Sequence, residues 1–174
     1  MDITLVKEAK RGSRNALVRL IMDEKQDYYR LAYAYTKNQD DALDALADMI
    51  VILYEKISVL KNEACFDTWS RTILVNCCKQ ILRKKKKIIL FDKMPEISHE
   101  GEFRQKEQEI LLDSALSKLS PKHQEVLKLR FFLDFEYQTI AEILKIPVGT
   151  VRSRISTGLA KLKNILGDEN YGGN

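Results

Sequence analysis

Hydrogen-bonding side chains and arginines gather in the stretch VGTVRSRISTG, residues 148–158. Apolar residues with helical spacing lie on both sides of a break that contains Pro and Gly, which predicts a helix-turn-helix over residues 137–162. The second helix turns short hydroxyls and a forked cation away from its apolar side, and such groups can hydrogen-bond to base edges and phosphates in a DNA major groove. They are Thr150, Arg152, Ser153 and Ser156. This stretch alone also allows an ordinary helical hairpin with a solvated basic face.

Carboxylates form a second candidate binding surface. Asp41, Asp44 and Asp48 are spaced by three and four residues, which places them in one row of a predicted helix. Like charges in a row repel one another, so we interpret this row as a surface for a basic partner, which Val51 and Ile52 extend. A plain solvated acidic face is the alternative. A carboxylate metal site is disfavoured because no His or Glu completes a ligand set nearby.

A polar face that becomes increasingly basic marks a third candidate surface, between residues 66 and 87. The pattern predicts a helix that Asp67 caps, with an inward row at four-residue spacing from Trp69 to Ile81. Phe66, in the preceding loop, either packs on unpaired bases or anchors the core. The opposite side of the helix leads into consecutive cations and carries groups that suit phosphate contact: Thr72, Asn76, Lys79, Arg83 and Lys84.

The composition favours an all-α protein. The chain of 174 residues contains only seven Gly and three Pro, which leaves little material for turns. Its formal charge of +4 is segregated, with acidic residues at 23–48 and 96–113 and cations at 83–87 and after Lys145. We therefore predict two small helical domains joined by a flexible linker: residues 1–87, a linker at 88–104, residues 105–168 with the helix-turn-helix, and a frayed tail at 169–174.

Cysteine and histidine usage argues against a disulfide framework, a structural zinc site and catalysis. Cys77 and Cys78 are adjacent and no CxxC pair is present, so buried reduced thiols of a cytosolic protein are the better interpretation. His123 has no carboxylate or nucleophile beside it in its predicted helix turn. The N-terminus lacks the apolar run of a signal peptide, and no stretch approaches the ~20 apolar residues of a membrane span. We expect a soluble, cytoplasmic protein that is not an enzyme and needs no cofactor, metal or small-molecule substrate.

Helix starts and core rows are also predicted. Ser13 is expected to cap a helix after Gly12, and Ser120-Pro121 to start a helix in the second domain. The core of the second domain is expected to contain Val126, Leu127, Leu129 and Phe131, together with Val151, Ile155, Leu159 and Leu162.

Three motifs occur in a fixed order: DALDALADMIVILYEKI, then FDTWSRTILVNCCKQILRKKKK, then LSPKHQEVLKLRFF followed by IAEILKIPVGTVRSRI. Together they resemble the extracytoplasmic-function (ECF) sigma factors of the sigma-70 family, over nearly the whole chain. The resemblance implies an RNA polymerase sigma factor that binds core polymerase and promoter DNA and directs transcription initiation in response to an envelope or extracellular stress signal. It also implies control by an anti-sigma factor, which in this family is often anchored in the membrane.

The resemblance further implies residue roles. The row at Asp41, Asp44 and Asp48 corresponds to the helix that docks on the coiled clamp helices of the largest polymerase subunit. Residues 60–83 correspond to the segment that binds the melting promoter element, with Asn76 holding a flipped-out base. The surface around residues 131–135 corresponds to a contact with the polymerase flap. The distal promoter element would be read by Thr150, Arg152, Ser153, Ser156 and Thr157, with Arg154 at phosphate or at the domain surface.

Two single positions and one three-residue segment depart from the family pattern. Ala47 stands where Gln is usual, and Lys145 stands where Gly often ends the first helix of the helix-turn-helix. Residues 156–158 replace an aromatic-Arg-Ala pattern, and Gly158 inside a helix costs roughly 1 kcal/mol. We expect an unusual promoter preference to trace to Ser156 and Thr157.

Two other classes of function stay open from the residues. An autonomous dimeric helix-turn-helix regulator would need a self-association surface, and the sequence shows no heptad pattern or apolar dimer stripe beside the reading motif. A helical phosphohydrolase would need Asp41, Asp44 and Asp48 around a metal ion.

Overall fold

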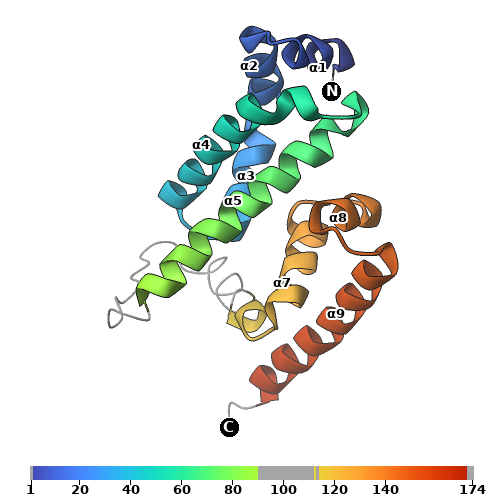
Figure 1. Ribbon diagram of the computed structural model, residues 1–174. Helices are drawn as coiled ribbons and strands as arrows, with labels where there is room; N and C mark the ends of the chain where they lie inside the picture. The colour runs from blue at the N-terminus through green and yellow to red at the C-terminus, as the bar shows by residue number, and fades with distance from the viewer. Residues whose placement is uncertain (1, 90–111, 113, 172–174) are drawn as a thin grey trace. The chain divides into compact units, whose positions relative to one another are not determined.

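The computed structural model describes residues 2–89, 112 and 114–171, and every regular element within them is helical (Figure 1). These residues divide into two helical units, an N-terminal one that contains residues 2–89 and a C-terminal one that contains residues 114–141 and 145–171. The prediction of two helical domains, the second with a helix-turn-helix, is confirmed.

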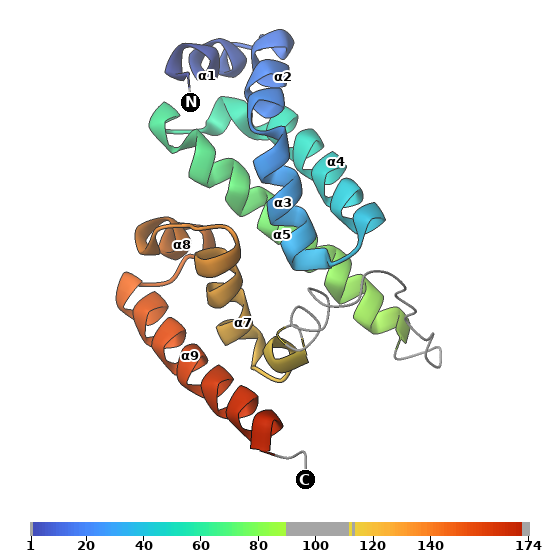
Figure 2. The same ribbon diagram turned by 180° about the vertical axis from the view of Figure 1, so that it is seen from behind.

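The N-terminal unit is built around three long helices. In both views α3, α4 and α5 lie side by side, and α1 and α2 lie at the end where α4 leads into a short 3-10 turn (Figures 1 and 2). The elements are α1 (Ile3–Lys10), α2 (Arg14–Asp23), α3 (Lys25–Thr36), α4 (Gln39–Lys56), the 3-10 turns η1 (Ile57–Val59) and η2 (Glu63–Cys65), and α5 (Phe66–Ile89).

Side-chain caps fix two of the helix starts. The Ser13 hydroxyl accepts a hydrogen bond from the Ala16 amide at 3.3 Å, as predicted, and begins α2. The Asn38 side-chain oxygen accepts one from the Asp41 amide at 3.0 Å and begins α4. Between α3 and α4, Lys37 adopts a left-handed conformation with φ of 53°, which ends α3. The chain reverses there within a few residues.

The buried row of α5 differs from the predicted one. Trp69, Ile73 and Ile81 are only half-buried. Asp67 does not cap α5, because the helix begins one residue earlier and the Asp67 carboxylate pairs with Arg71. A row that starts from the first residue of the helix therefore faces the core: Phe66, Ser70, Leu74, Val75, Cys77 and Cys78.

The helix predicted to start at Ser120-Pro121 is present in the C-terminal unit. Pro121 is the first residue of α7, as expected. The Ser120 hydroxyl, expected to cap the helix, makes no hydrogen bond to a backbone amide of its first turn and lies instead 3.0 Å from His123 Nδ1. A helical turn precedes α7, in which Ala115 and Leu116 are buried; the neighbouring positions 110 and 111 lie outside the described residues. The elements are α7 (Pro121–Leu127), a π-helical segment η3 (Lys128–Phe132), α8 (Tyr137–Leu144) and α9 (Val148–Tyr171).

Two residues predicted for the core of this unit are exposed. Phe131 is 58% exposed because it lies in η3, where the wider π-helical turn breaks the register that a regular α-helix would give it. Leu159 is 42% exposed because the inward row of α9 passes through Gly158 instead, after Val151 and Ile155. The other predicted core residues are buried, apart from Leu162, which is half-buried.

Gly158 lets α7 and α9 approach each other closely. A Cβ atom at this position would lie 3.1 Å from Leu127 Cδ1 and 3.4 Å from His123 Cβ. The glycine that departs from the family pattern therefore fills a packing role, and the close contact offsets its low helix propensity.

Lys145 takes the place of glycine at the end of α8. Its φ is 53°, in the left-handed region, and the Ile146 amide donates a hydrogen bond to the Ala141 carbonyl at 3.0 Å. This is the six-to-one bond of a Schellman ending, which is formed here without glycine.

The last helix of each unit continues past the residue at which the domain was predicted to end. α5 continues to Ile89, so the first two residues of the predicted linker are helical, and residues 90–104 lie outside the described part of the chain. α9 continues through Gly167 to Tyr171, which corrects the frayed tail predicted from residue 169; residues 172–174 are not described.

Candidate binding surfaces

The outer side of α4 combines apolar side chains with carboxylates. Asp44, Asp48 and Val51 are exposed, and Ile52 is half-buried. Beside them lies an apolar row that the sequence pattern did not predict: Leu43, Ala47, Ile50 and Tyr54. Their spacing of four, three and four residues follows one side of a helix, but only the buried row of α4 shows that this side faces outward. An apolar row with an acidic edge suits a basic amphipathic partner.

Asp41 does not belong to this exposed surface, which corrects the predicted row of three carboxylates. The residue is 6% exposed, and its Oδ2 lies 2.6 Å from Lys85 Nζ on α5. Asp41 lies in the first turn of α4 beside the buried Ala42, on the side that α5 covers. The pair borders a groove of about 320 Å³ between α4 and α5 that is lined by Asp41, Asp44, Ala47, Asp48, Ile81, Lys84 and Lys85.

The outer side of α5 presents an amide and a cation in one row. Asn76 and Arg83 are exposed and seven residues apart, which puts them on the same side of the helix about 10 Å from each other. Lys79 lies between them and is half-buried. Lys84 is exposed, but it lines the groove toward α4 instead. Among residues 83–85, Arg83 therefore lies on the side of α5 suited to a nucleic-acid backbone, whereas Lys84 and Lys85 line the groove toward α4.

Phe66 is part of the hydrophobic core, the second of its two predicted roles, and this removes it from the residues expected to contact DNA. It is 2% exposed, and its ring packs against Trp69 with 6.2 Å between the ring centroids. An aromatic ring that is almost completely buried has no free face on which a base could stack. Phe66 instead anchors the start of α5.

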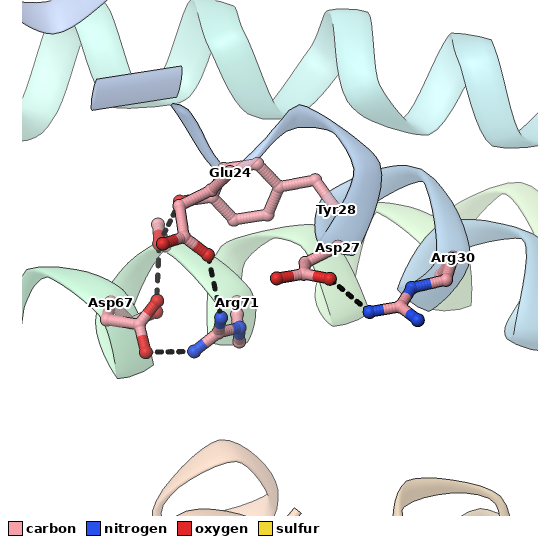
Figure 3. Close-up of polar contacts among 7 residues, drawn as sticks. Glu24, Asp27, Tyr28, Arg30, Asp67 and Arg71 are labelled. Atoms are coloured by element: carbon pink, nitrogen blue, oxygen red, sulfur yellow. Dashed lines mark hydrogen bonds and ion pairs between the residues drawn. The ribbon is translucent and has the colours of Figure 1, made fainter. Parts of the chain in front are cut away.

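A polar network holds the first turns of α5 against the junction of α2 and α3 (Figure 3). The Arg71 side chain is 11% exposed and lies between two carboxylates: its Nη2 is 3.1 Å from Glu24 Oε2, and its Nη1 pairs with Asp67. The Ser70 hydroxyl donates to the Asp67 carbonyl at 2.8 Å and lies 2.7 Å from the Tyr28 hydroxyl. Because Ser70 has a single proton to donate, Tyr28 donates to Ser70. Burial raises the pKa of Tyr28 to about 12.

The second helix of the helix-turn-helix exposes most of its predicted contact residues. Its first turn is uncrowded at Gly149, where an added Cβ atom would meet open space. The Ser153 hydroxyl donates to the Thr150 carbonyl at 3.0 Å. Thr150 and Arg154 are half-buried, and the exposed members of the set are Arg152, Ser153, Ser156 and Thr157.

Arg130 braces the turn that leads into α8, a role that the sequence pattern did not reveal. Its guanidinium donates to the Phe135 carbonyl at 3.2 Å and lies 5.5 Å from the centre of the Tyr137 ring. It also lies 3.5 Å from Asp134. A groove of about 570 Å³ opens beside it, lined by Arg130, Glu136, Tyr137, Gln138, Val148 and Arg152.

Two of the thiols and His123 are buried. Burial raises the pKa of Cys77 to about 11 and that of Cys78 to about 12, whereas Cys65 is exposed. Burial also lowers the pKa of His123, and the nearby cation Lys161 acts in the same direction.

Neither a metal site nor a membrane helix is found in the part of the chain that the structure covers. Over residues 2–89 and 114–171, no three His, Cys, Asp or Glu side chains gather in a way that could hold a metal ion. In the same ranges, no helix is both long and apolar enough to span a bilayer.

Known families and proteins match both units. Residues 20–88 match sigma-70 region 2, and residues 115–164 match sigma-70 region 4. RNA polymerase sigma factor SigV of Bacillus subtilis is 35% identical over 156 residues, which cover 88% of this chain and 93% of that protein. ECF RNA polymerase sigma factor SigW of Bacillus subtilis is 26% identical over 178 residues, with coverage of 94% and 95%.

Solved structures share the fold. CnrH, in complex with the cytosolic domain of CnrY, gives a TM-score of 0.72 at 21% identity and covers 95% of this chain and 97% of its own. The sigma factor RpoE from Bartonella quintana, in complex with the anti-sigma factor NepR, gives 0.65 at 20% identity, with coverage of 86% and 95%. With two sigma-70 regions in order and a nearly full-length relative at 35% identity, this chain belongs to the ECF sigma factors of the sigma-70 family.

Proposed function

We propose that this sigma factor is a dissociable promoter-specificity subunit that docks on core RNA polymerase through the outer side of α4. The observation that carries this proposal is the exposed apolar row from Leu43 to Tyr54, edged by Asp44 and Asp48. Such a surface buries apolar area against a partner helix, while its carboxylates select a basic one. The coiled clamp helices of the largest polymerase subunit are the partner that the family implies.

Promoter DNA is bound in two places in this proposal. Asn76 receives a flipped-out base of the melting element, and Arg83 and Lys79 neutralise the neighbouring backbone; Lys84 assists from the edge of the groove. Unstacking a base costs a few kcal/mol, so a polar side chain and cations on one side of α5 must compensate. The distal element is read from the start of α9 by Thr150, Arg152, Ser153, Ser156 and Thr157, with Arg154 at phosphate.

Regulation by an anti-sigma factor is the further part of the proposal. The related folds CnrH and RpoE were solved in complex with a partner protein, which for RpoE is an anti-sigma factor. An inhibitor that covers the apolar row of α4 would keep this chain from polymerase in the cytoplasm, or at the membrane if the inhibitor is anchored there. Release in response to an envelope or extracellular stress signal would then start transcription.

Run-off transcription with core polymerase tests the function. Genomic fragments, including the region upstream of the chain's own coding sequence, should give discrete transcripts only when both proteins are present. Asp44→Arg with Asp48→Arg should lower affinity for core polymerase at least tenfold, as expected for like charges placed against a basic partner. The matched control is Glu8→Arg, an exposed carboxylate on α1.

Two results would contradict the proposal. Protection of a promoter by the free protein at nanomolar concentration would show that it reads DNA without polymerase. A stable dimer in gel filtration, with binding to palindromic DNA, would favour an autonomous helix-turn-helix regulator.

A further inference from the structure

The basic end of α5 has little apolar support. Within residues 66–85, the last fully buried side chain is Cys78; Ile81 is half-buried, and residues 82–85 are exposed. Consecutive cations at this end repel one another along the helix. A contact other than the core must therefore fix its direction.

Lys85 supplies that contact by pairing with Asp41. Ile81 and Lys85 are four residues apart and line the groove toward α4, whereas Asn76 and Arg83 form the row on the outer side. The Lys85 Nζ atom reaches Asp41 Oδ2 at 2.6 Å. The carboxylate is 9% exposed and the lysine side chain 50% exposed, so the pair is shielded from solvent mainly on the Asp41 side.

Asp41 is held in place in the first turn of α4. Its backbone amide is held by the Asn38 side chain at 3.0 Å, in the first turn of α4. Burial leaves the short Asp41 side chain few other conformations, so pairing with Lys85 costs little further conformational freedom on the Asp41 side. The start of α4 and the end of α5 are thereby joined across 44 positions of sequence.

We propose that Asp41 and Lys85 form a clasp that positions the outer row of α5 for the melted promoter strand. The inference rests on the proposed function. Lys85 pairs with Asp41 and does not contact DNA. Asp41 is a positioning residue: by holding Lys85 it sets the direction of α5, which carries the DNA-contacting row. Neither residue contacts the polymerase clamp helices in this proposal, so Asp41 and Asp44 have different roles although they are three residues apart.

Open-complex formation by the holoenzyme tests the clasp. Permanganate reactivity of unpaired thymines is measured on the promoter found by run-off transcription, with Asp41→Asn, Lys85→Met, their combination, and Lys85→Arg. Each neutralising change should lower open-complex formation about fivefold, and the double variant should be no worse than either single one, because both remove the same interaction. Lys85→Arg keeps the charge and should stay near the wild-type level.

Affinity for core polymerase is measured on the same proteins. Asp41→Asn should leave it unchanged, whereas Asp44→Asn should weaken it. Two results would overturn the clasp: an increase in open-complex formation with Asp41→Asn, which would make Lys85 a DNA contact that Asp41 holds back, or a loss of polymerase affinity with Asp41→Asn equal to that with Asp44→Asn.

Amide hydrogen exchange on the free protein separates this inference from the proposed function. Asp41→Asn and Lys85→Met should speed exchange at residues 79–89 at least threefold, and Glu8→Gln, which changes an exposed carboxylate on α1, should not. If the wild-type protein supports no transcription, the function fails, while the exchange result still decides whether the clasp holds α5. Unchanged exchange in both neutralised variants would refute the clasp.

Discussion

α5 and α9 are both 24 residues long, and both present the polar side chains expected to contact DNA, but they are held in different ways. α5 is fixed at its start by the Arg71 network and near its end by the Asp41–Lys85 pair. α9 is fixed by close packing at Gly158. We infer that the direction of α5 is sensitive to charge and that of α9 to side-chain volume.

The largest effect is expected from Gly158→Leu. A side chain cannot fit where a Cβ atom already lies 3.1 Å from Leu127 Cδ1, so the C-terminal unit should lose about 3 kcal/mol of stability. Amide hydrogen exchange in α7 and α9 measures the loss. Ala160→Leu is the matched control because residue 160 is exposed on the same helix. Equal losses of stability in the two variants would contradict the inference that close packing at Gly158 fixes α9.

Arg71→Leu should destabilise the N-terminal unit by about 2 kcal/mol. The change leaves Glu24 and Asp67 without their shared cation, and both carboxylates are about one-third exposed, which limits the cost. Chemical denaturation followed by Trp69 fluorescence measures it. Arg30→Leu removes a pair with Asp27 at the exposed surface and should change little. A stable Arg71→Leu protein would mean that apolar packing alone holds the start of α5.

Alkaline pH should weaken the N-terminal unit through Tyr28. Its pKa is raised from 10.0 to about 12 in the folded chain, so the contribution is full below pH 10 and is lost as pH rises from 10 toward 12. The slope is about 1.4 kcal/mol per pH unit in that window. Tyr28→Phe should remove this slope, and the difference between the two proteins excludes Cys77 and Cys78, which titrate in both. Identical pH profiles would show that the hydroxyl is not buried on folding.

Salt should produce the smallest effect. At about 1 M salt the screening length is near 3 Å, so the Asp41–Lys85 pair, whose lysine is half-exposed, weakens while the contact at Gly158 does not. Hydrogen exchange at residues 79–89 should accelerate relative to α9 by less than threefold. Equal acceleration in both helices would contradict the proposed difference.

Local signals predicted much of this molecule. Ser13 and the Ser120-Pro121 pair begin helices as expected, and Asn76, Arg83, Arg152, Ser153, Ser156 and Thr157 lie on exposed sides of theirs. These features depend on spacing within one helix and on capping chemistry, which neighbouring residues largely determine. The roles of the exposed residues in binding stay predictions.

The wrong predictions concern which side chains are buried. Phe66 and Asp41 are buried and Phe131 and Leu159 are exposed, against expectation. Phe66 was expected in a loop and is the first residue of α5, and Phe131 lies in a π-helical turn. For Asp41 and Leu159 the helix was predicted correctly, but a partner helix decides which of two adjacent rows is buried. The exposed row from Leu43 to Tyr54 was missed for the same reason, because an apolar residue on a helix can face either a core or a binding partner.

The sequence by itself determined that this is an all-α member of the sigma-70 family, with two units and three polar helix faces, because helix periodicity and motif order are local properties. Tertiary structure decided which carboxylates remain available, which cations are already paired, and why a glycine stands inside α9. Those outcomes depend on contacts between segments that are distant in sequence, such as Asp41 with Lys85 and Gly158 with Leu127. These contacts form, and contribute to stability, only when the helices pack together.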